Sequence, residues 1–204
     1  MIAVIDYGAG NLQSVRNALD SLGCKNTIAV SAREILSADA VILPGVGAFG
    51  SAMAEMEKRG LTETVKEAAM SGKPFLGICA GMQLLFDESE ESPGVRGLGI
   101  IPGKVLRFPT AEGLKIPHMG WNSVKRVKES RLIGADAKEP YMYFVHSYYV
   151  KAKEREAVSA VSFYGTEFDA AIEKGNIFGC QFHPEKSGGA GIELLERFTR
   201  LNGK

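Results

Sequence analysis

Residues 73–85 read Lys-Pro-Phe-Leu-Gly-Ile-Cys-Ala-Gly-Met-Gln-Leu-Leu, an apolar strand followed by a tight turn and the start of a helix. The Gly-x-Cys-x-Gly pattern at the turn matches a nucleophile elbow with sulfur in place of oxygen. Gly77 and Gly81 leave room for a strained backbone at Cys79 and for close packing of the helix on the strand. Such a turn directs the sulfur out of the sheet, and the helix N-terminus favours thiolate over thiol. Cys79 is therefore a candidate nucleophile.

Strand and helix patterns alternate through the whole first half of the chain. Strands are predicted at residues 1–5, 27–30, 40–43 and 74–78, and helices at 12–22, from Ser31 and at 61–71. Short apolar strands that alternate with amphipathic helices bury both faces of a sheet, which predicts a parallel, doubly wound α/β fold. Ligands of such sheets bind at the carboxyl ends of the strands.

The second half of the chain is richer in strands. An acidic loop is expected at 87–99, followed by strands at 100–108, 142–150 and 157–164, a hairpin over 168–182 and a final helix at 192–201. We expect these strands to add a partly antiparallel region to the sheet. No repeat or low-complexity linker divides the chain, which predicts a single domain over residues 1–204.

The composition excludes several classes of protein. Lys plus Arg and Asp plus Glu each total 24 in 204 residues, so the basic excess of a nonspecific nucleic-acid binder is missing. Three cysteines without a Cys-x-x-Cys pair argue against a disulfide framework and a zinc ribbon, and no metal site is expected. The longest uncharged stretch, residues 40–54, contains Pro44 and is too short for a membrane span, and no signal peptide is visible. We expect a reduced, cytoplasmic, soluble protein.

A cysteine nucleophile needs a histidine as its base, and the chain offers three: His118, His146 and His183. Residues 182–185 read Phe-His-Pro-Glu directly after an apolar strand. Pro184 favours an extended backbone at His183, so that Glu185 can lie beside the imidazole and orient it. A lone histidine before proline is more often structural, and the elbow at Cys79 is what favours a catalytic interpretation here.

An attacked carbonyl also needs two donors for its oxyanion. The backbone N–H of Ala80 is one candidate, because it directly follows the nucleophile. The loop Pro-Gly-Val-Gly at residues 44–47 follows the third predicted strand and therefore opens at the same sheet edge as Cys79. An ordinary turn from strand to helix is an equally good interpretation of this loop taken alone.

Other patterns favour structural roles. Residues 8–10, Gly-Ala-Gly, resemble the opening of a dinucleotide fingerprint, but Gln13 occupies the third glycine position, so no cofactor is expected. Two further cysteines have no partner pattern and are interpreted as structural: Cys24 and Cys180. The acidic run 87–91 and the basic segment 123–137 are interpreted as solvated surface.

Residues 77–83, Gly-Ile-Cys-Ala-Gly-Met-Gln, and residues 182–185 together resemble the class I, or triad, glutamine amidotransferase family over essentially the whole chain. The resemblance implies a three-layer, flavodoxin-like fold with a mostly parallel central sheet flanked by helices, and additional antiparallel strands. It also implies that Cys79, His183 and Glu185 hydrolyse L-glutamine to L-glutamate and ammonia through a γ-glutamyl thioester, without a cofactor.

The same resemblance implies roles for further residues. The oxyanion donors would be the backbone N–H groups of Gly47 and Ala80. Five positions correspond to residues that line the glutamine pocket of similar enzymes: Gln83, Glu91, His146, Ser147 and Tyr148. Glu91, in the acidic run, would then contact the substrate ammonium.

Four segments resemble one branch of this family: residues 6–11 (Asp-Tyr-Gly-Ala-Gly-Asn), 44–47, 117–122 (Pro-His-Met-Gly-Trp-Asn) and 143–148 (Tyr-Phe-Val-His-Ser-Tyr). Members of that branch are glutaminase subunits that form heterodimers with a separate (β/α)8-barrel cyclase in L-histidine biosynthesis. The resemblance implies that ammonia is channelled to the cyclase, which makes imidazole glycerol phosphate and an aminoimidazole carboxamide ribonucleotide. Tyr143 and Lys186 would border the partner interface.

Two other interpretations stay open on the sequence. One is a different cysteine hydrolase on the same scaffold, such as a γ-glutamyl hydrolase or a glutaminase that serves another synthase. Hydrolysis of a γ-glutamyl peptide would identify it. The other is a non-catalytic binding module, which labelling of Cys79 by a glutamine-like electrophile would exclude.

Overall fold

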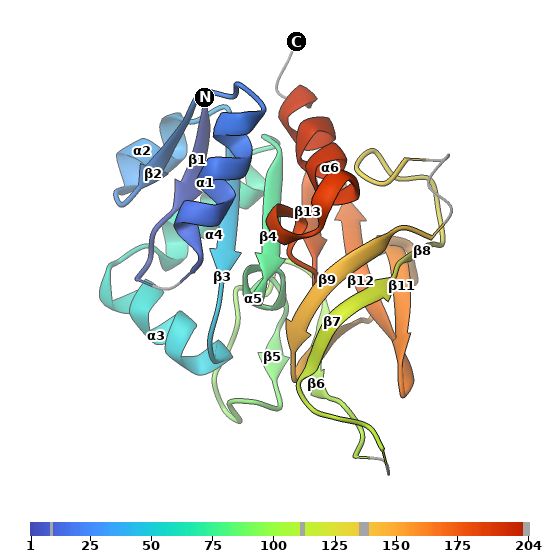
Figure 1. The fold of residues 1–204 in the computed structure, drawn as a ribbon. Helices are drawn as coiled ribbons and strands as arrows, with labels where there is room; N and C mark the ends of the chain where they lie inside the picture. Colours follow the sequence, from blue (N-terminus) through green and yellow to red (C-terminus); the bar gives the residue numbers. More distant parts are fainter. Residues whose placement is uncertain (9, 111–112, 135–138, 202–204) are drawn as a thin grey trace.

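The computed structural model describes residues 1–8, 10–110, 113–134 and 139–201 (Figure 1). The strands are β1 (Ile2–Ile5), β2 (Asn26–Ala29), β3 (Ala40–Gly45), β4 (Phe75–Cys79), β5 (Glu88–Ser89), β6 (Gly103–Arg107), β7 (His118–Ser123), β8 (Lys125–Arg126), β9 (Tyr141–His146), β10 (Tyr148–Ala152), β11 (Val158–Tyr164), β12 (Thr166–Lys174) and β13 (Ile177–Cys180). The helices are α1 (Leu12–Ser21), α2 (Ala32–Ser37), α3 (Phe49–Lys58), α4 (Thr62–Met70), α5 (Ala80–Gln83) and α6 (Gly188–Arg200), with 3-10 turns η1 (Arg155–Ala157) and η2 (Pro184–Lys186).

One sheet runs through the molecule in the order β2-β1-β3-β4-β13-β12-β10-β6-β5, with β11 beside β12 and β8 beside β11. The strands from β2 to β13 in this order are parallel. The strands β12, β10 and β6 are antiparallel to their neighbours on this path, apart from the parallel pair β5 and β6. β13 therefore joins the parallel and antiparallel halves. The predicted α/β fold with a mostly parallel sheet and added antiparallel strands is confirmed.

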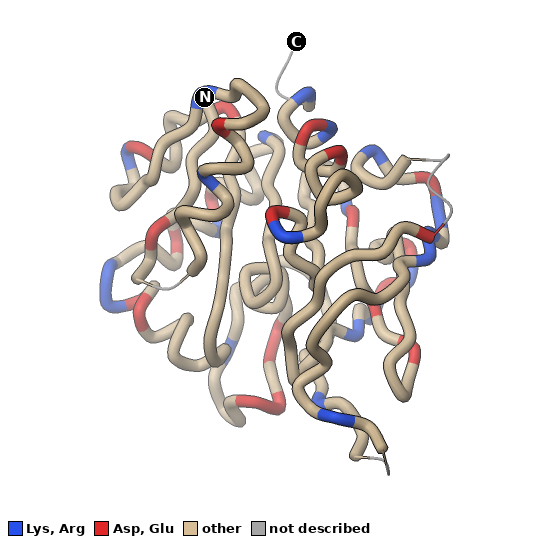
Figure 2. The backbone as a smooth tube through the Cα atoms, viewed as in Figure 1, with Lys and Arg blue, Asp and Glu red and all other residues tan. Residues whose placement is uncertain are grey.

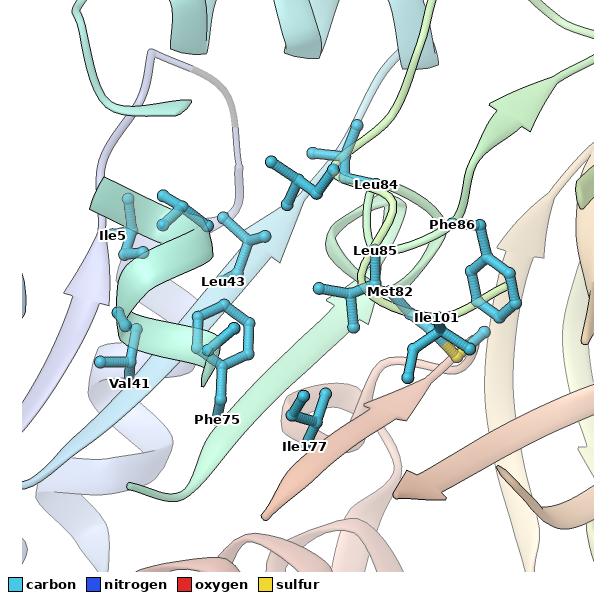
Figure 3. Close-up of a cluster of buried hydrophobic side chains, with 14 of the residues drawn as sticks. Ile5, Val41, Leu43, Phe75, Met82, Leu84, Leu85, Phe86, Ile101 and Ile177 are labelled. Carbon is cyan, nitrogen blue, oxygen red and sulfur yellow. The ribbon is translucent and has the colours of Figure 1, made fainter. Parts of the chain in front are cut away.

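Alternate residues of an inner strand pack on opposite faces of the sheet. In β1, Ile2 and Val4 belong to the buried cluster that includes residues of α1 and α6, and Ala3 and Ile5 belong to the cluster with residues of α2, α3 and α4. Figure 3 shows part of the latter cluster around Phe75. The strands β1, β3, β4 and β13 carry no charged residue, and Figure 2 shows charges mainly on the surrounding helices, loops and outer strands. Helices on both faces thus produce three layers.

The single strand predicted at 142–150 is wrong, because the structure has two strands there. β9 pairs antiparallel with β7 in a separate two-stranded ribbon, and β10 returns to the central sheet between β12 and β6. Ser147 lies at the break, and its carbonyl oxygen accepts the N–H of Phe108. The two strands are separated by one residue and no turn residues mark the boundary, so the change of sheet leaves no break in the sequence pattern.

Helix α3 is absent from the predicted elements, and it begins at Phe49, two residues after the predicted loop at residues 44–47. The Glu91 carboxylate accepts the N–H of Phe49 at 2.7 Å, and the Ser92 hydroxyl oxygen accepts that of Gly50 at 3.0 Å. These acceptors satisfy N–H groups that a helix leaves free at its N-terminus. Residues distant in the sequence therefore define where α3 begins. The interpretation of the acidic run 87–91 as purely solvated surface is wrong, because Glu91 in this run makes one of these contacts.

The basic segment 123–137 is also more than solvated surface, although its residues 135–137 lie outside the described residues. The Arg131 guanidinium lies 4.6 Å from the centroid of the Phe178 ring, and its Nε lies 2.8 Å from Glu173 Oε1. The Lys128 ammonium donates to the carbonyl oxygen of Glu173 at 2.8 Å. These contacts attach the segment to β12 and β13. Ala9, in the tested fingerprint at 8–10, likewise lies outside the described residues.

None of the helices in the described parts of the chain combines the length and apolar character that crossing a bilayer requires.

Candidate active site

Three neighbouring parallel strands bring the predicted site residues to one edge of the sheet. β3, β4 and β13 are adjacent, and Gly77 of β4 is opposite Leu43 on one side and Gly179 on the other. The loop from Val46 follows β3, Cys79 ends β4, and the segment containing His183 follows β13. Carboxyl ends of parallel strands meet at the same edge, so residues far apart in the sequence converge there.

Cys79 has the strained backbone that the elbow pattern predicts. Its φ is 54° and ψ is −114°, in a region that side-chain-bearing residues rarely adopt, and α5 begins at the next residue. A Cβ added at Gly81 would lie 1.9 Å from the Leu43 carbonyl oxygen, and one at Gly77 would lie 2.8 Å from the Gly81 oxygen. Glycine at these two positions is therefore what lets α5 pack directly on β3 and β4. The Cys79 side chain is 7% exposed.

His183 and Glu185 form a buried pair. His183 Nδ1 lies 2.8 Å from Glu185 Oε1, and the two side chains are 2% and 1% exposed. The backbone at His183 is extended, as Pro184 predicts, whereas Pro184 to Lys186 form the turn η2 rather than continuing the strand. Burial lowers the pKa of His183, but the neighbouring Cys79 sulfur and Glu185 carboxylate outweigh it and raise this pKa to about 10. The surroundings thus favour an imidazolium at His183, beside the Cys79 sulfur and the Glu185 carboxylate.

A cavity of about 380 Å³ opens at Cys79 and His183. Its remaining lining residues are Val46, Gly47, Ala48, Ala80, Gln83, Glu91, Pro117, Val145, His146, Ser147 and Tyr148. The lining includes both predicted oxyanion positions and all five predicted glutamine-pocket positions. Four lining residues were not predicted as site residues: Val46, Ala48, Pro117 and Val145. Of these, all but Ala48 stand in the segments 44–47, 117–122 and 143–148 that carry the family resemblance. A larger hollow of about 650 Å³, between α3, α4 and residues 95–97, includes none of these residues.

The loop after β3 lies against the start of α5. A Cβ added at Gly45 would be 2.4 Å from the Gly81 nitrogen and 2.8 Å from the Ala80 Cβ. Gly47 has φ +91°, a left-handed conformation that glycine adopts without steric cost. The two candidate oxyanion residues, Gly47 and Ala80, both line the cavity.

Two buried side-chain amides and the Cys79 sulfur form a hydrogen-bond network at the cavity. Gln83 Nε2 donates to the Tyr148 carbonyl oxygen at 2.9 Å and to Gln181 Oε1 at 3.0 Å. Gln181 Nε2 in turn donates to Cys79 Sγ at 3.7 Å. Sequence analysis assigned no role to Gln181. Its position two residues before His183 in an extended segment was the available signal, because such residues share a side of the chain.

A second chain of hydrogen bonds holds His146. Burial lowers the pKa of His146 to about 3 and of His118 to about 4, so both rings are neutral. His146 Nδ1 donates to the Tyr148 carbonyl oxygen at 2.8 Å, which leaves Nε2 to accept from His118 Nδ1 at 2.9 Å. Asn122 Nδ2 lies 3.3 Å from His118 Nε2 and donates to the Phe163 carbonyl oxygen at 2.9 Å. All hydrogen bonds in this series therefore run in one direction, each group donating to the next from Asn122 to the Tyr148 carbonyl oxygen.

The two predicted interface residues lie outside the cavity lining, beside His183. The Tyr143 carbonyl oxygen accepts the His183 N–H at 2.9 Å, and the exposed Lys186 donates its N–H to the His183 carbonyl oxygen at 3.0 Å. Tyr143 is opposite Trp121 in the β7–β9 ribbon. The outward face of this ribbon is apolar and exposed, since Met119, Trp121 and Tyr141 are 62%, 55% and 63% accessible.

Comparisons with known proteins agree with this geometry. Residues 3–201 match the family model described as glutamine amidotransferase class-I. The chain is 52% identical over 201 residues to imidazole glycerol phosphate synthase subunit HisH of Methanothermobacter thermautotrophicus, which covers 98% of both chains. It is 50% identical over 200 residues to the protein of the same name from Desulfitobacterium hafniense, over 98% of this chain and 94% of that one. A crystal structure of a glutamine amidotransferase has the same fold, with a TM-score of 0.77 and 19% identity over 100% of both chains. The chain therefore belongs to the class-I glutamine amidotransferase family and, within it, to the imidazole glycerol phosphate synthase subunit HisH family.

Proposed function

We propose that this chain, as a single domain over residues 1–204, hydrolyses L-glutamine to L-glutamate and ammonia within an imidazole glycerol phosphate synthase. The observation that carries the proposal is the convergence of Cys79 and the His183–Glu185 pair on one cavity at the carboxyl ends of β4 and β13. Membership of the HisH family supports the substrate and the pathway, L-histidine biosynthesis.

The reaction proceeds by acyl transfer to sulfur. The Cys79 thiolate attacks the side-chain amide carbon of glutamine, and the oxyanion that forms is bound by the backbone N–H groups of Ala80 and Gly47. The His183 imidazolium gives a proton to the departing ammonia, which leaves a γ-glutamyl thioester on Cys79. The neutral His183 then takes a proton from water as the water attacks the thioester, and glutamate leaves as the thiolate is restored. Glu185 holds the imidazole and stabilises its cation.

The cavity walls supply groups suited to an amino acid. The Glu91 carboxylate lines the cavity and offers a negative charge for the substrate ammonium, while its Oε2 also accepts the Phe49 N–H. Gln83 and the segment from His146 to Tyr148 also line the cavity, and Gln83 Nε2 donates to the Tyr148 carbonyl oxygen. The hydrogen bonds that tie Gln83 and His146 to the Tyr148 carbonyl oxygen support a positioning role for both, rather than free side chains waiting for substrate.

A (β/α)8-barrel cyclase is the proposed partner in a heterodimer. The exposed apolar face of the β7–β9 ribbon, with Trp121 and Met119, lies next to Tyr143 and Lys186 and offers an interface beside the reacting residues. Direct passage into the barrel has a chemical reason, because free ammonia in neutral water becomes ammonium, which has no lone pair for attack. In the barrel, ammonia would contribute to imidazole glycerol phosphate, with an aminoimidazole carboxamide ribonucleotide as the second product.

The proposal places the reaction in the cytoplasm. Three cysteines are free in the structure, and Cys79 must stay reduced to act, which suits a reducing compartment.

Glutamate release from glutamine, measured with the cyclase barrel and its nucleotide substrate, tests the proposal. We expect the rate to rise by orders of magnitude over that of the chain alone, and to be lost in Cys79→Ala. Cys24→Ala is the matched control, because Cys24 is half-buried and outside the cavity. Cyclase activity supplied with ammonium salt should survive Cys79→Ala. Turnover of a γ-glutamyl peptide without any response to the barrel would instead identify a different hydrolase.

A further inference from the structure

Gln181 is a buried polar residue that contacts the reacting sulfur and has no task in the proposed mechanism. It lies directly after β13, is 0% exposed, and its own N–H donates to the Ala170 carbonyl oxygen at 2.9 Å. Its side-chain Nε2 lies 3.7 Å from Cys79 Sγ, within reach of a hydrogen bond to sulfur.

The direction of the Gln181 amide follows from its neighbours. A carbonyl oxygen only accepts, so the Gln83 atom that lies 2.9 Å from the Tyr148 oxygen is the amide nitrogen. That nitrogen also faces the Gln181 amide at 3.0 Å, where it requires an acceptor, so the facing atom is Oε1. The Gln181 nitrogen is consequently turned toward Cys79. An inverted amide would set nitrogen against nitrogen and leave buried polar groups unpaired.

We propose that Gln181 is a further catalytic residue, whose amide N–H binds the Cys79 sulfur and stabilises its thiolate form. A neutral thiol is a weak acceptor, whereas a thiolate is a charged and strong one. The contact therefore gains strength when Cys79 loses its proton. It loses strength again when the sulfur becomes a neutral thioester. Gln83 acts through Gln181 and is a positioning residue.

The pH profile of Cys79 alkylation by iodoacetamide in the full chain tests this contact, with the modified cysteine identified by mass spectrometry. Gln181→Met keeps the length of the side chain and removes the donor. If the bond favours the thiolate about tenfold, the acid limb of the profile moves about one pH unit higher in the variant. Thiolates with fewer donors are also more nucleophilic, so the alkaline plateau should rise about threefold. The profiles of variant and parent then cross.

Gln13→Met is the matched control, because Gln13 is exposed on α1 and its side-chain amide donates to the exposed Asn17. Its profile should coincide with that of the parent chain. Gln181→Leu also removes the donor and leaves an apolar side chain of similar volume, so it should move the acid limb in the same direction if Gln181→Met does not fold. Urea unfolding identifies any variant that fails to fold.

The effect of Gln181 on turnover rests on the proposed function. With the barrel present, the acid limb of kcat/KM for glutamine should shift in the variant by the same amount as the acid limb of alkylation. An acid limb that does not move in a folded Gln181→Met or Gln181→Leu chain would refute the role of Gln181. A shifted alkylation limb together with no glutamine hydrolysis by the parent complex would refute the proposed function and leave the contact standing.

Discussion

Gly81→Ala separates the effect of packing from that of helix propensity. Gly81 is in the first turn of α5, and alanine in a helix is favoured over glycine by about 1 kcal/mol. The added Cβ would lie 1.9 Å from the Leu43 carbonyl oxygen and 2.8 Å from the Leu43 carbonyl carbon. Both atoms are backbone of a central strand, so no side-chain rotation can relieve the overlap, and α5 must move away from β3.

Overpacking of this kind costs about 1–3 kcal/mol, and a backbone clash belongs at or above the upper end of that range. We therefore expect Gly81→Ala to lower the free energy of unfolding by about 3 kcal/mol or more. The displacement of α5 caused by this substitution should also move Ala80 and Cys79. Glutamine hydrolysis should therefore fall together with stability.

Gly189→Ala is the control for propensity. Gly189 is also in the first turn of a helix, α6, and a Cβ there meets nothing within 4 Å. Its free energy of unfolding should stay unchanged or rise by up to about 1 kcal/mol. Urea unfolding followed by circular dichroism compares the two variants. Equal stability of Gly81→Ala and Gly189→Ala would refute the close approach of α5 to β3.

Three further predictions concern the buried histidines. Burial lowers the pKa of His118 to about 4 and of His146 to about 3. As the pH falls below about 6.5, the unfolded chain therefore takes up protons on these rings while the folded chain does not. The free energy of unfolding should then fall by about 1.4 kcal/mol per pH unit for each ring as the pH is lowered from 6.5 to 4. The raised pKa of His183 acts at the alkaline end of the pH range. Its contribution to the free energy of unfolding is complete below about pH 6.5 and is lost as the pH rises toward 10. Urea unfolding across pH 4–10 should therefore show maximal stability between these limits, and a flat profile would contradict both assignments. His118→Phe keeps an aromatic ring but leaves His146 Nε2 without its donor. This loss should lower the free energy of unfolding by about 1–3 kcal/mol in the same assay, and it should raise the KM for glutamine more than it lowers kcat. His118→Asn can still donate a hydrogen bond and should recover most of the loss. Glu185→Gln removes the carboxylate from the imidazolium, so the pKa of His183, followed by NMR, should fall below its value of about 10. Glutaminase turnover should drop by roughly 10²-fold or more. An unchanged His183 titration would show that Glu185 does not stabilise the imidazolium.

The fold was predictable where the sequence pattern is local. The strand at residues 74–78 and the glycines on either side of Cys79 predict the elbow, and the structure confirms its strained φ. The same holds for the hairpin at 168–182, which the structure has as β12 and β13. These elements depend on alternation, turn residues and glycine, all of which lie within a few positions of each other.

The errors share a different origin, because they concern contacts between distant segments. The start of α3 depends on Glu91, and the break at Ser147 depends on β7 offering β9 a partner. The contact of Gln181 with Cys79 also needs Gln83 to fix the direction of its amide. Nothing in the spacing of one segment reports the donors and acceptors of another, so these features required coordinates.

The position of β13 has a consequence for biosynthesis of the protein. β13 is the last strand in the chain and yet occupies a place between β4 and β12, inside the sheet. A ribosome therefore delivers Cys79 long before the strand that leads to His183. If these residues act as proposed, the growing polypeptide holds a sulfur nucleophile without its histidine partner during that interval, and hydrolysis of cellular glutamine has to wait until folding is nearly finished.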